Sequence, residues 1–151
     1  MRPQSSLRTI LFSALFLISI GAQSSHVFTV FGANINFFMA GLPALLMAVP
    51  ASVVGFLVIA AVAMLKTIPV LQGASLALLL VAFLVSLGRR FVPLHPALLN
   101  PMLSAGGVAG FYALTNRVMF SARAALLTEL LTTAFVSLFF TMLIQNFNEK
   151  R

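Results

Sequence analysis

Few residues in this sequence could carry out acid–base, nucleophilic or metal chemistry. The 151 residues include two acids, Glu129 and Glu149, two histidines, His26 and His95, and no cysteine. Thiolate chemistry and cysteine-based metal sites are therefore excluded. No Ser/His/Asp set, glycine-rich phosphate loop or carboxylate pair is present. We expect a protein that is not an enzyme and has no catalytic residue, cofactor or metal.

Glu129 is the one acid that falls inside an apolar segment. A carboxyl group at membrane depth is costly and marks a functional or packing site. It could bind a proton or cation, or contact a partner helix. Alternatively, Glu129 pairs with Arg123 or Arg117 near the membrane interface and fixes the helix position. Nearby threonines are expected to donate to carbonyl groups of their own helix: Thr128, Thr132 and Thr133.

Two glycines, Gly106 and Gly110, lie four residues apart in another apolar segment. This spacing places both on one helix face, where the missing side chains allow another backbone to approach closely. The functional interpretation is a contact with a partner protein. The alternative is packing within the protein's own helix bundle.

A polar cavity is a second candidate site. His95 and Asn100 flank an irregular helix start that contains Pro96 and Pro101. Together with Gln72 and Glu129, these side chains could line a cavity for a small molecule. The alternative is that His95 and Asn100 lie at the membrane interface and satisfy broken helix hydrogen bonds.

The composition predicts a membrane protein. Hydrophobic residues make up 61% of the chain and charged residues 7%, against about 25% charged in soluble domains. Residues 9–65 include no Lys, Arg, Asp or Glu. The net charge of +7 comes from basic residues scattered between apolar segments. That distribution is typical of topology determinants, so we expect no nucleic-acid partner.

We predict an all-α integral membrane bundle of six transmembrane helices, with five as the alternative, in a single domain over 1–151. Pro43 and Pro50 offer breaks in the long apolar run. Six helices with a cytoplasmic N-terminus place six basic residues inside and three outside, as the positive-inside rule prefers. An extended, re-entrant or interfacial segment is expected after the first helix. The helices are expected near 8–22, 36–49, 51–65, 70–88, 94–115 and 124–144.

The first of these segments has a second interpretation. A basic start followed by a short apolar stretch is also the pattern of a signal peptide, with cleavage near Ala22. Ile20, three positions before that site, fits the preference for small residues poorly. We therefore favour an uncleaved first helix. No internal repeat is found, so the sequence gives no support to an inverted-repeat transporter.

The order of features resembles MreD, a small membrane protein of the bacterial rod-shape machinery. The likeness begins with Gln23-Ser24-Ser25 and a break that contains Gly32, and continues with Gly55 to Gly73 and the apolar run Ala74–Val85. It ends with Arg89-Arg90-Phe91 and a last helix bearing an acid, Glu129. Two positions depart from the family: it commonly has a proline near Asn34–Asn36 and an aspartate near Lys66.

The resemblance implies a non-catalytic scaffold subunit of the bacterial cytoplasmic (inner) membrane that supports cell shape and peptidoglycan synthesis during elongation. Its expected partners are membrane lipid, an MreC-like protein and cell-wall synthases, with contacts at Gly106, Gly110 and Glu129. Two alternatives stay open. One is a substrate-binding subunit like the vitamin-uptake S components of energy-coupling-factor transporters, whose fold MreD is thought to share. The other is a holin-like pore-forming protein.

Overall fold

The computed structural model of the chain describes residues 3–24, 29–30, 33–65 and 73–149. The fold is all-helical, as predicted, with six α-helices in the described part. A two-residue antiparallel pairing and a 3₁₀ helix lie between them. The elements are α1 (Pro3–Ser24), β1 (Thr29–Val30), β2 (Ala33–Asn34), α2 (Phe37–Ala48), α3 (Ala51–Leu65), α4 (Gly73–Phe91), α5 (Pro96–Thr115), η1 (Arg117–Phe120) and α6 (Arg123–Glu149).

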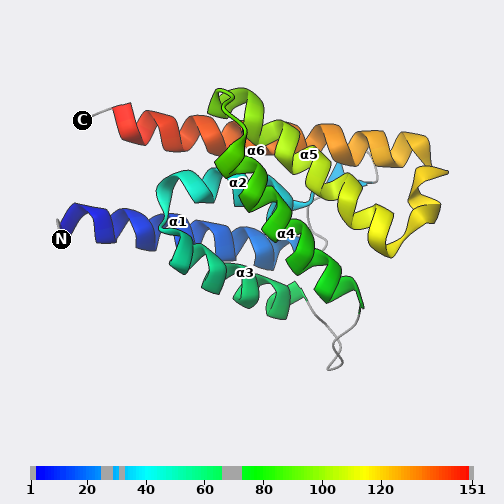
Figure 1. The fold of residues 1–151 in the computed structure, drawn as a ribbon, viewed down its shortest axis with the longest axis horizontal. Coiled ribbons are helices and arrows are strands. Elements are labelled where there is room, and N and C mark those ends of the chain that lie inside the picture. Colours follow the sequence, from blue (N-terminus) through cyan, green and yellow to red (C-terminus); the bar gives the residue numbers. More distant parts are fainter. Residues whose placement is uncertain (1–2, 25–28, 31–32, 66–72, 150–151) are drawn as a thin grey trace.

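The six helices run alternately in opposite directions (Figure 1). α1 starts at one end of the bundle and runs to the other, and α6 runs back to the end at which α1 starts. Both ends of the chain therefore lie on one side, as expected for an even number of passes. The other side holds the β1–β2 pairing and η1.

Four helices are long and apolar enough to cross a membrane: α1, α4, α5 and α6. The remaining two are shorter, with 12 residues in α2 and 15 in α3. At 1.5 Å per residue they reach about 18 and 23 Å, against a hydrocarbon core of about 30 Å. The expected number of helices is confirmed, but these two are too short to cross the core alone.

The short helix α2 occupies the centre of the bundle and contacts all five other helices. Its residues from Phe38 to Leu45 are buried. A helix start that is buried needs partners for its free N–H groups. Here the Asn36 side chain accepts from the Met39 N–H at 3.1 Å, and Gln23 Oε1 of α1 accepts from the Phe38 N–H at 2.9 Å. The polar residues of the predicted break thus start the central helix.

A tight turn joins α2 to α3. Val49 is extended (φ −125°, ψ 139°), the conformation that a following proline favours. The Pro50 carbonyl then accepts from the N–H groups of Val53 and Val54, which begins α3. Pro50 therefore breaks the apolar run, whereas Pro43 lies inside α2.

The last helix extends five residues beyond its expected end at 144 and reaches Glu149. The apolar part of the sequence ends near residue 144, but contacts with α1 stabilise the additional residues of α6. Arg8 Nη2 donates to the Phe147 carbonyl at 3.1 Å. The Phe12 and Phe147 rings meet edge to face, with centroids 6.0 Å apart.

Candidate functional site

Helix α6 carries two opposite stripes of side chains at a spacing of four residues. Large apolar side chains such as Leu131 and Phe135 are 69% and 73% exposed, as expected for a surface in contact with lipid. The opposite stripe is buried although its members are polar: Glu129, Thr133, Ser137 and Thr141. Small hydroxyl side chains are typical of contacts between membrane helices, where they allow close approach and form hydrogen bonds.

We call the buried polar contact between α5 and α6 the polar ladder. It is formed by the α6 stripe and by side chains of α4 and α5: Arg89, Asn100, Ser104 and Tyr112.

Asn100 of α5 is the most connected member of the polar ladder and is fully buried. Its Oδ1 accepts from Arg89 Nη1 of α4 at 2.7 Å. Its Nδ2 donates to Thr141 Oγ1 of α6 at 2.9 Å and lies 3.2 Å from Met47 Sδ of α2. One amide thus joins four helices, and its charged partner makes the Arg89 bond stronger than a neutral one.

Two further pairs continue the polar ladder along α5. The hydroxyl groups of Ser104 and Ser137 are 2.8 Å apart, and Ser104 also bonds to the Asn100 carbonyl at 2.8 Å. At the far end, the Tyr112 hydroxyl donates to Glu129 Oε2 at 2.7 Å. Glu129 is only 6% exposed, and no cationic side chain in the described part of the chain forms an ion pair with it.

The register of these pairs identifies one missing contact. α5 and α6 are antiparallel, so four residues forward along α5 correspond to four residues backward along α6. Val108 therefore lies opposite Thr133. Val108 and Thr133 are both fully buried, and the Thr133 hydroxyl has no hydrogen-bond partner. Valine offers neither donor nor acceptor, which explains the unpaired hydroxyl. The four opposite positions are Asn100 and Thr141, Ser104 and Ser137, Val108 and Thr133, and Tyr112 and Glu129.

The register predicts how Val108→Thr changes the free energy of unfolding. A hydroxyl in a buried apolar position normally costs about 1–3 kcal/mol. At position 108 it would face the Thr133 hydroxyl, so the free energy of unfolding should stay within about 1 kcal/mol of the parent. Val81→Thr, in a buried α4 position outside the polar ladder, is the matched control and should carry the full cost. Equal losses for both variants, measured by detergent-induced unfolding, would contradict the register.

The structure places Glu129 differently from the expected ion pair. Its hydrogen-bond partner is Tyr112, while the Arg123 side chain is exposed; the side chain of Arg117 lies outside the described residues. Thr128 and Thr132 donate to carbonyl groups of their own helix, as predicted. The same prediction was wrong for Thr133, whose hydroxyl has no hydrogen-bond partner.

The two candidate glycines do not share one environment. A Cβ on Gly106 would meet nothing within 4 Å, and this residue is exposed. A Cβ on Gly110 would lie 3.8 Å from Val81 Cγ2 of α4. Of the three α5 glycines, Gly107 allows the closest approach, since a Cβ there would lie 2.9 Å from Met39 Sδ. Gly106 thus faces outward, and Gly107 faces the core.

The residues of the expected polar cavity are not brought together. His95 is exposed and caps the start of α5, where its Nδ1 accepts from the Ala97 N–H at 3.3 Å. Asn100 is buried within the polar ladder. Glu129 lies twelve residues from Thr141, the α6 partner of Asn100, or roughly 18 Å along the helix. Gln72 lies outside the described residues.

Most members of the polar ladder were missed by the sequence interpretation: Arg89, Ser104, Tyr112, Ser137 and Thr141. For Ser137 and Thr141 the signal was present, as polar residues at every fourth position of α6, a pattern that places them on one helix face. In the part of the chain that the structure describes, no group of three or more His, Asp or Glu residues could hold a metal ion. Every ladder member except Thr133 forms a hydrogen bond to another member, and these bonds join helices.

The sequence matches no protein-family model, and the comparisons with curated proteins and with solved structures found no match.

Proposed function

We propose that this chain is a non-catalytic membrane scaffold subunit, resembling MreD, that supports cell shape and peptidoglycan synthesis during elongation. One observation carries the proposal: the buried polar side chains between α5 and α6 bind each other across helices. Such contacts fix the relative positions of helices, as a scaffold requires. The outer surface is then free to bind other membrane proteins.

The same observation disfavours a substrate-binding transporter subunit. A small-molecule site is a concave pocket of some hundreds of Å³ with converging polar groups. Here Asn100 uses its oxygen for Arg89 and its nitrogen for Thr141. His95 is exposed at the start of α5, whereas Asn100 is fully buried. The two side chains therefore do not line one site for a ligand.

The proposed location is the bacterial cytoplasmic membrane, with both ends of the chain in the cytoplasm. Arg8 lies near the start of α1, and Arg89 and Arg90 lie in the last turn of α4. Both helix ends are on the side of the bundle at which the chain begins, whereas η1, which begins at Arg117, and the start of α6 at Arg123 are on the other side (Figure 1). This distribution supports the proposed orientation because cytoplasmic ends of membrane helices carry the excess of Lys and Arg.

The exposed side of α5 at Gly106 is the proposed contact with a partner such as an MreC-like protein. A leucine at this position would project from the helix where no other atom of the described bundle lies within 4 Å of a Cβ. Gly106→Leu should therefore leave the fold intact but reduce recovery of the partner from native membranes by about tenfold, equivalent to 1.4 kcal/mol. Leu131→Ala on the exposed face of α6 is the control and should leave recovery unchanged.

The deciding experiment is purification of the tagged protein from its native membrane in a mild detergent, followed by mass spectrometry. Recovery of an MreC-like protein or a cell-wall synthase would support the proposal. An ATPase pair with a coupling membrane subunit would contradict it and indicate a transporter component. A homo-oligomer without partners would instead favour the pore-forming alternative.

A further inference from the structure

Glu129 is an acidic side chain inside a helix that is long and apolar enough to cross a membrane. It lies six residues after the start of α6 at Arg123, or roughly 9 Å along the helix axis. Its side chain is buried against α5, where the Tyr112 hydroxyl donates to Oε2 at 2.7 Å. The carboxyl group therefore has a neutral partner at a depth where a charge is costly.

Few charged groups lie near enough to balance a charge on Glu129. Of the elements that pack against α6, α2, α5 and β2 include no charged residue and no histidine. Arg123 is exposed and forms no ion pair with Glu129, and the side chain of Arg117 in η1 lies outside the described residues. Arg8 and Arg89 make their hydrogen bonds at the opposite end of the bundle. A buried carboxylate needs a cation or several hydrogen-bond donors, and Tyr112 supplies a single donor.

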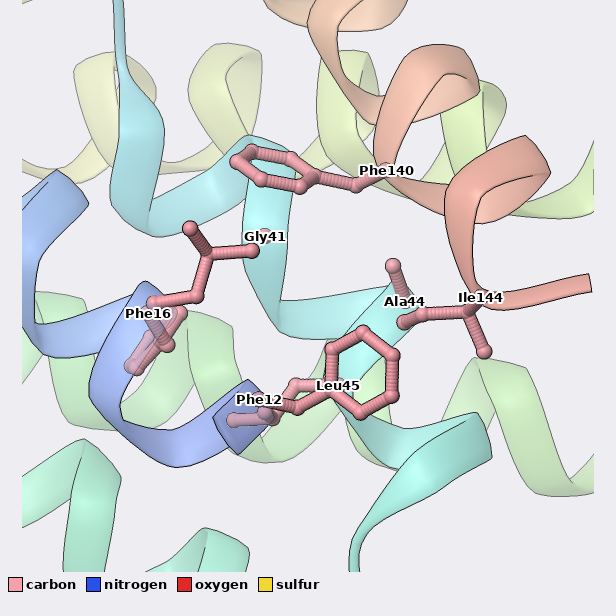
Figure 2. A pocket seen from close by; sticks show the side chains of 8 residues that line it. Phe12, Phe16, Gly41, Ala44, Leu45, Phe140 and Ile144 are labelled. Atoms are coloured by element: carbon pink, nitrogen blue, oxygen red, sulfur yellow. The ribbon is translucent and has the colours of Figure 1, made fainter. Parts of the chain in front are cut away.

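The other half of α6 borders an interior that cannot hydrate a charge. A cavity of about 20 Å³ lies between α1, α2 and α6, and its lining is entirely apolar, with Phe12, Phe140 and Ile144 among its walls (Figure 2). A buried water molecule needs about two to four polar partners, and this lining offers none. Water can therefore approach Glu129 only from the end of the bundle that holds η1.

We propose that Glu129 is a proton-binding site and that its carboxyl group is neutral in the folded bundle. Oε2 accepts the hydrogen bond from Tyr112, and Oε1 carries the proton. Binding a proton removes the charge that lipid and apolar side chains cannot solvate. This inference is independent of the proposed scaffold role.

The surroundings of Glu129 suit a proton better than a metal cation. Metal cations such as Ca²⁺ and Mg²⁺ require several oxygen ligands. One turn further along the polar ladder, Thr133 offers a single hydroxyl and Val108 offers no polar atom. A proton needs only one oxygen atom, which the Glu129 carboxyl itself provides.

The chain has only two acidic side chains, Glu129 and Glu149, which makes infrared spectroscopy a specific test. A protonated carboxyl group has a C=O stretching band that ionised carboxylates and amides lack. The purified protein at neutral pH, in a maltoside detergent without carbonyl groups, should show one such band, and the band should shift in heavy water. Glu129→Gln should abolish it while the bundle stays folded, because the glutamine carbonyl can still accept from Tyr112.

Two further variants serve as controls. Glu149→Gln changes the acid in the polar end of the sequence and should leave the band unchanged. Tyr112→Phe should keep the band but move it to higher frequency, because Oε2 loses its hydrogen bond. Absence of the band from the folded parent protein, or its persistence in Glu129→Gln, would overturn the proposal. A band that is absent from the parent but appears in Arg117→Gln would overturn it in favour of an ion pair between Arg117 and Glu129.

Discussion

Replacing Asn100 with alanine should lower the free energy of unfolding by about 2–3 kcal/mol, because Arg89 loses a charge-assisted hydrogen bond and the buried Thr141 hydroxyl loses one of its two partners. The Asn100 side chain is the acceptor for Arg89 and the donor to Thr141. Its removal also ends the contact with Met47 of the central helix. Hydrogen bonds between membrane helices average only about 0.6 kcal/mol when measured individually. The larger effect expected here comes from losing several partners at once, one of them charged.

Unfolding of the purified protein by increasing sodium dodecyl sulfate in mixed micelles, followed by far-ultraviolet circular dichroism, measures this loss. Asn116→Ala is the matched control, because Asn116 is exposed and its side chain makes no capping bond to η1. It should change the free energy of unfolding by less than about 0.5 kcal/mol. A similar small change for Asn100→Ala would show that the polar ladder contributes little to holding the helices together.

The helices themselves could be predicted from the sequence for a simple physical reason. An apolar segment in lipid must satisfy its backbone groups internally, so a long uncharged run such as the one that includes residues 73–88 becomes a helix. The break at Pro50 was also predictable, since proline disfavours a helical conformation in the residue before it. Helix ends outside the apolar run were less predictable. α6 continues to Glu149 because Arg8 and Phe12 of a distant helix pack against its last turns.

The polar ladder could not be predicted in the same way. The fourfold spacing of Thr133, Ser137 and Thr141 indicates a shared face but not the helix opposite that face. The partners depend on the register of α5 against α6, which long-range packing determines. Asn100 is the clearest example: its place near two prolines suggested the membrane interface, whereas the structure buries it completely. The hydrophobicity of the neighbouring residues cannot distinguish a buried position from one at the membrane surface, because the lipid-facing surface of a membrane protein is apolar too.

The glycines of α5 also show that sequence spacing alone does not tell which residue faces the core. Gly106 and Gly110 were favoured because they share the spacing of helix contact motifs, and Gly107 lies between them. A rotation of 100° between neighbouring helix positions decides which glycine faces the core. Gly107 is buried and Gly106 is exposed. Adjacent residues of the same type therefore have different roles, and substitution can separate them.

Leucine at position 107 should disrupt the contact of α5 with α2 and α4. A Cβ at Gly107 would lie 2.9 Å from Met39 Sδ and 3.3 Å from Val85 Cγ2, and leucine adds three further carbon atoms. Met39 and Val85 are both buried in the core, so making room for a whole leucine side chain would displace their neighbours, although the flexible end of Met39 can yield to a single methyl group. Gly107→Leu should therefore lower the free energy of unfolding by about 3 kcal/mol, at the upper end of overpacking costs.

Gly106→Leu is the matched control, since the same change one residue earlier projects into open space. Its free energy of unfolding should stay within about 0.5 kcal/mol of the parent. Gly107→Ala gives an intermediate case, because its single added methyl group meets the flexible Met39 side chain and should cost about 1 kcal/mol. Detergent unfolding of the three variants should rank them in the order Gly106→Leu, Gly107→Ala, Gly107→Leu. Equal stability of the two leucine variants would mean that α5 is rotated relative to this structure, and that the outward face proposed for partner binding lies elsewhere.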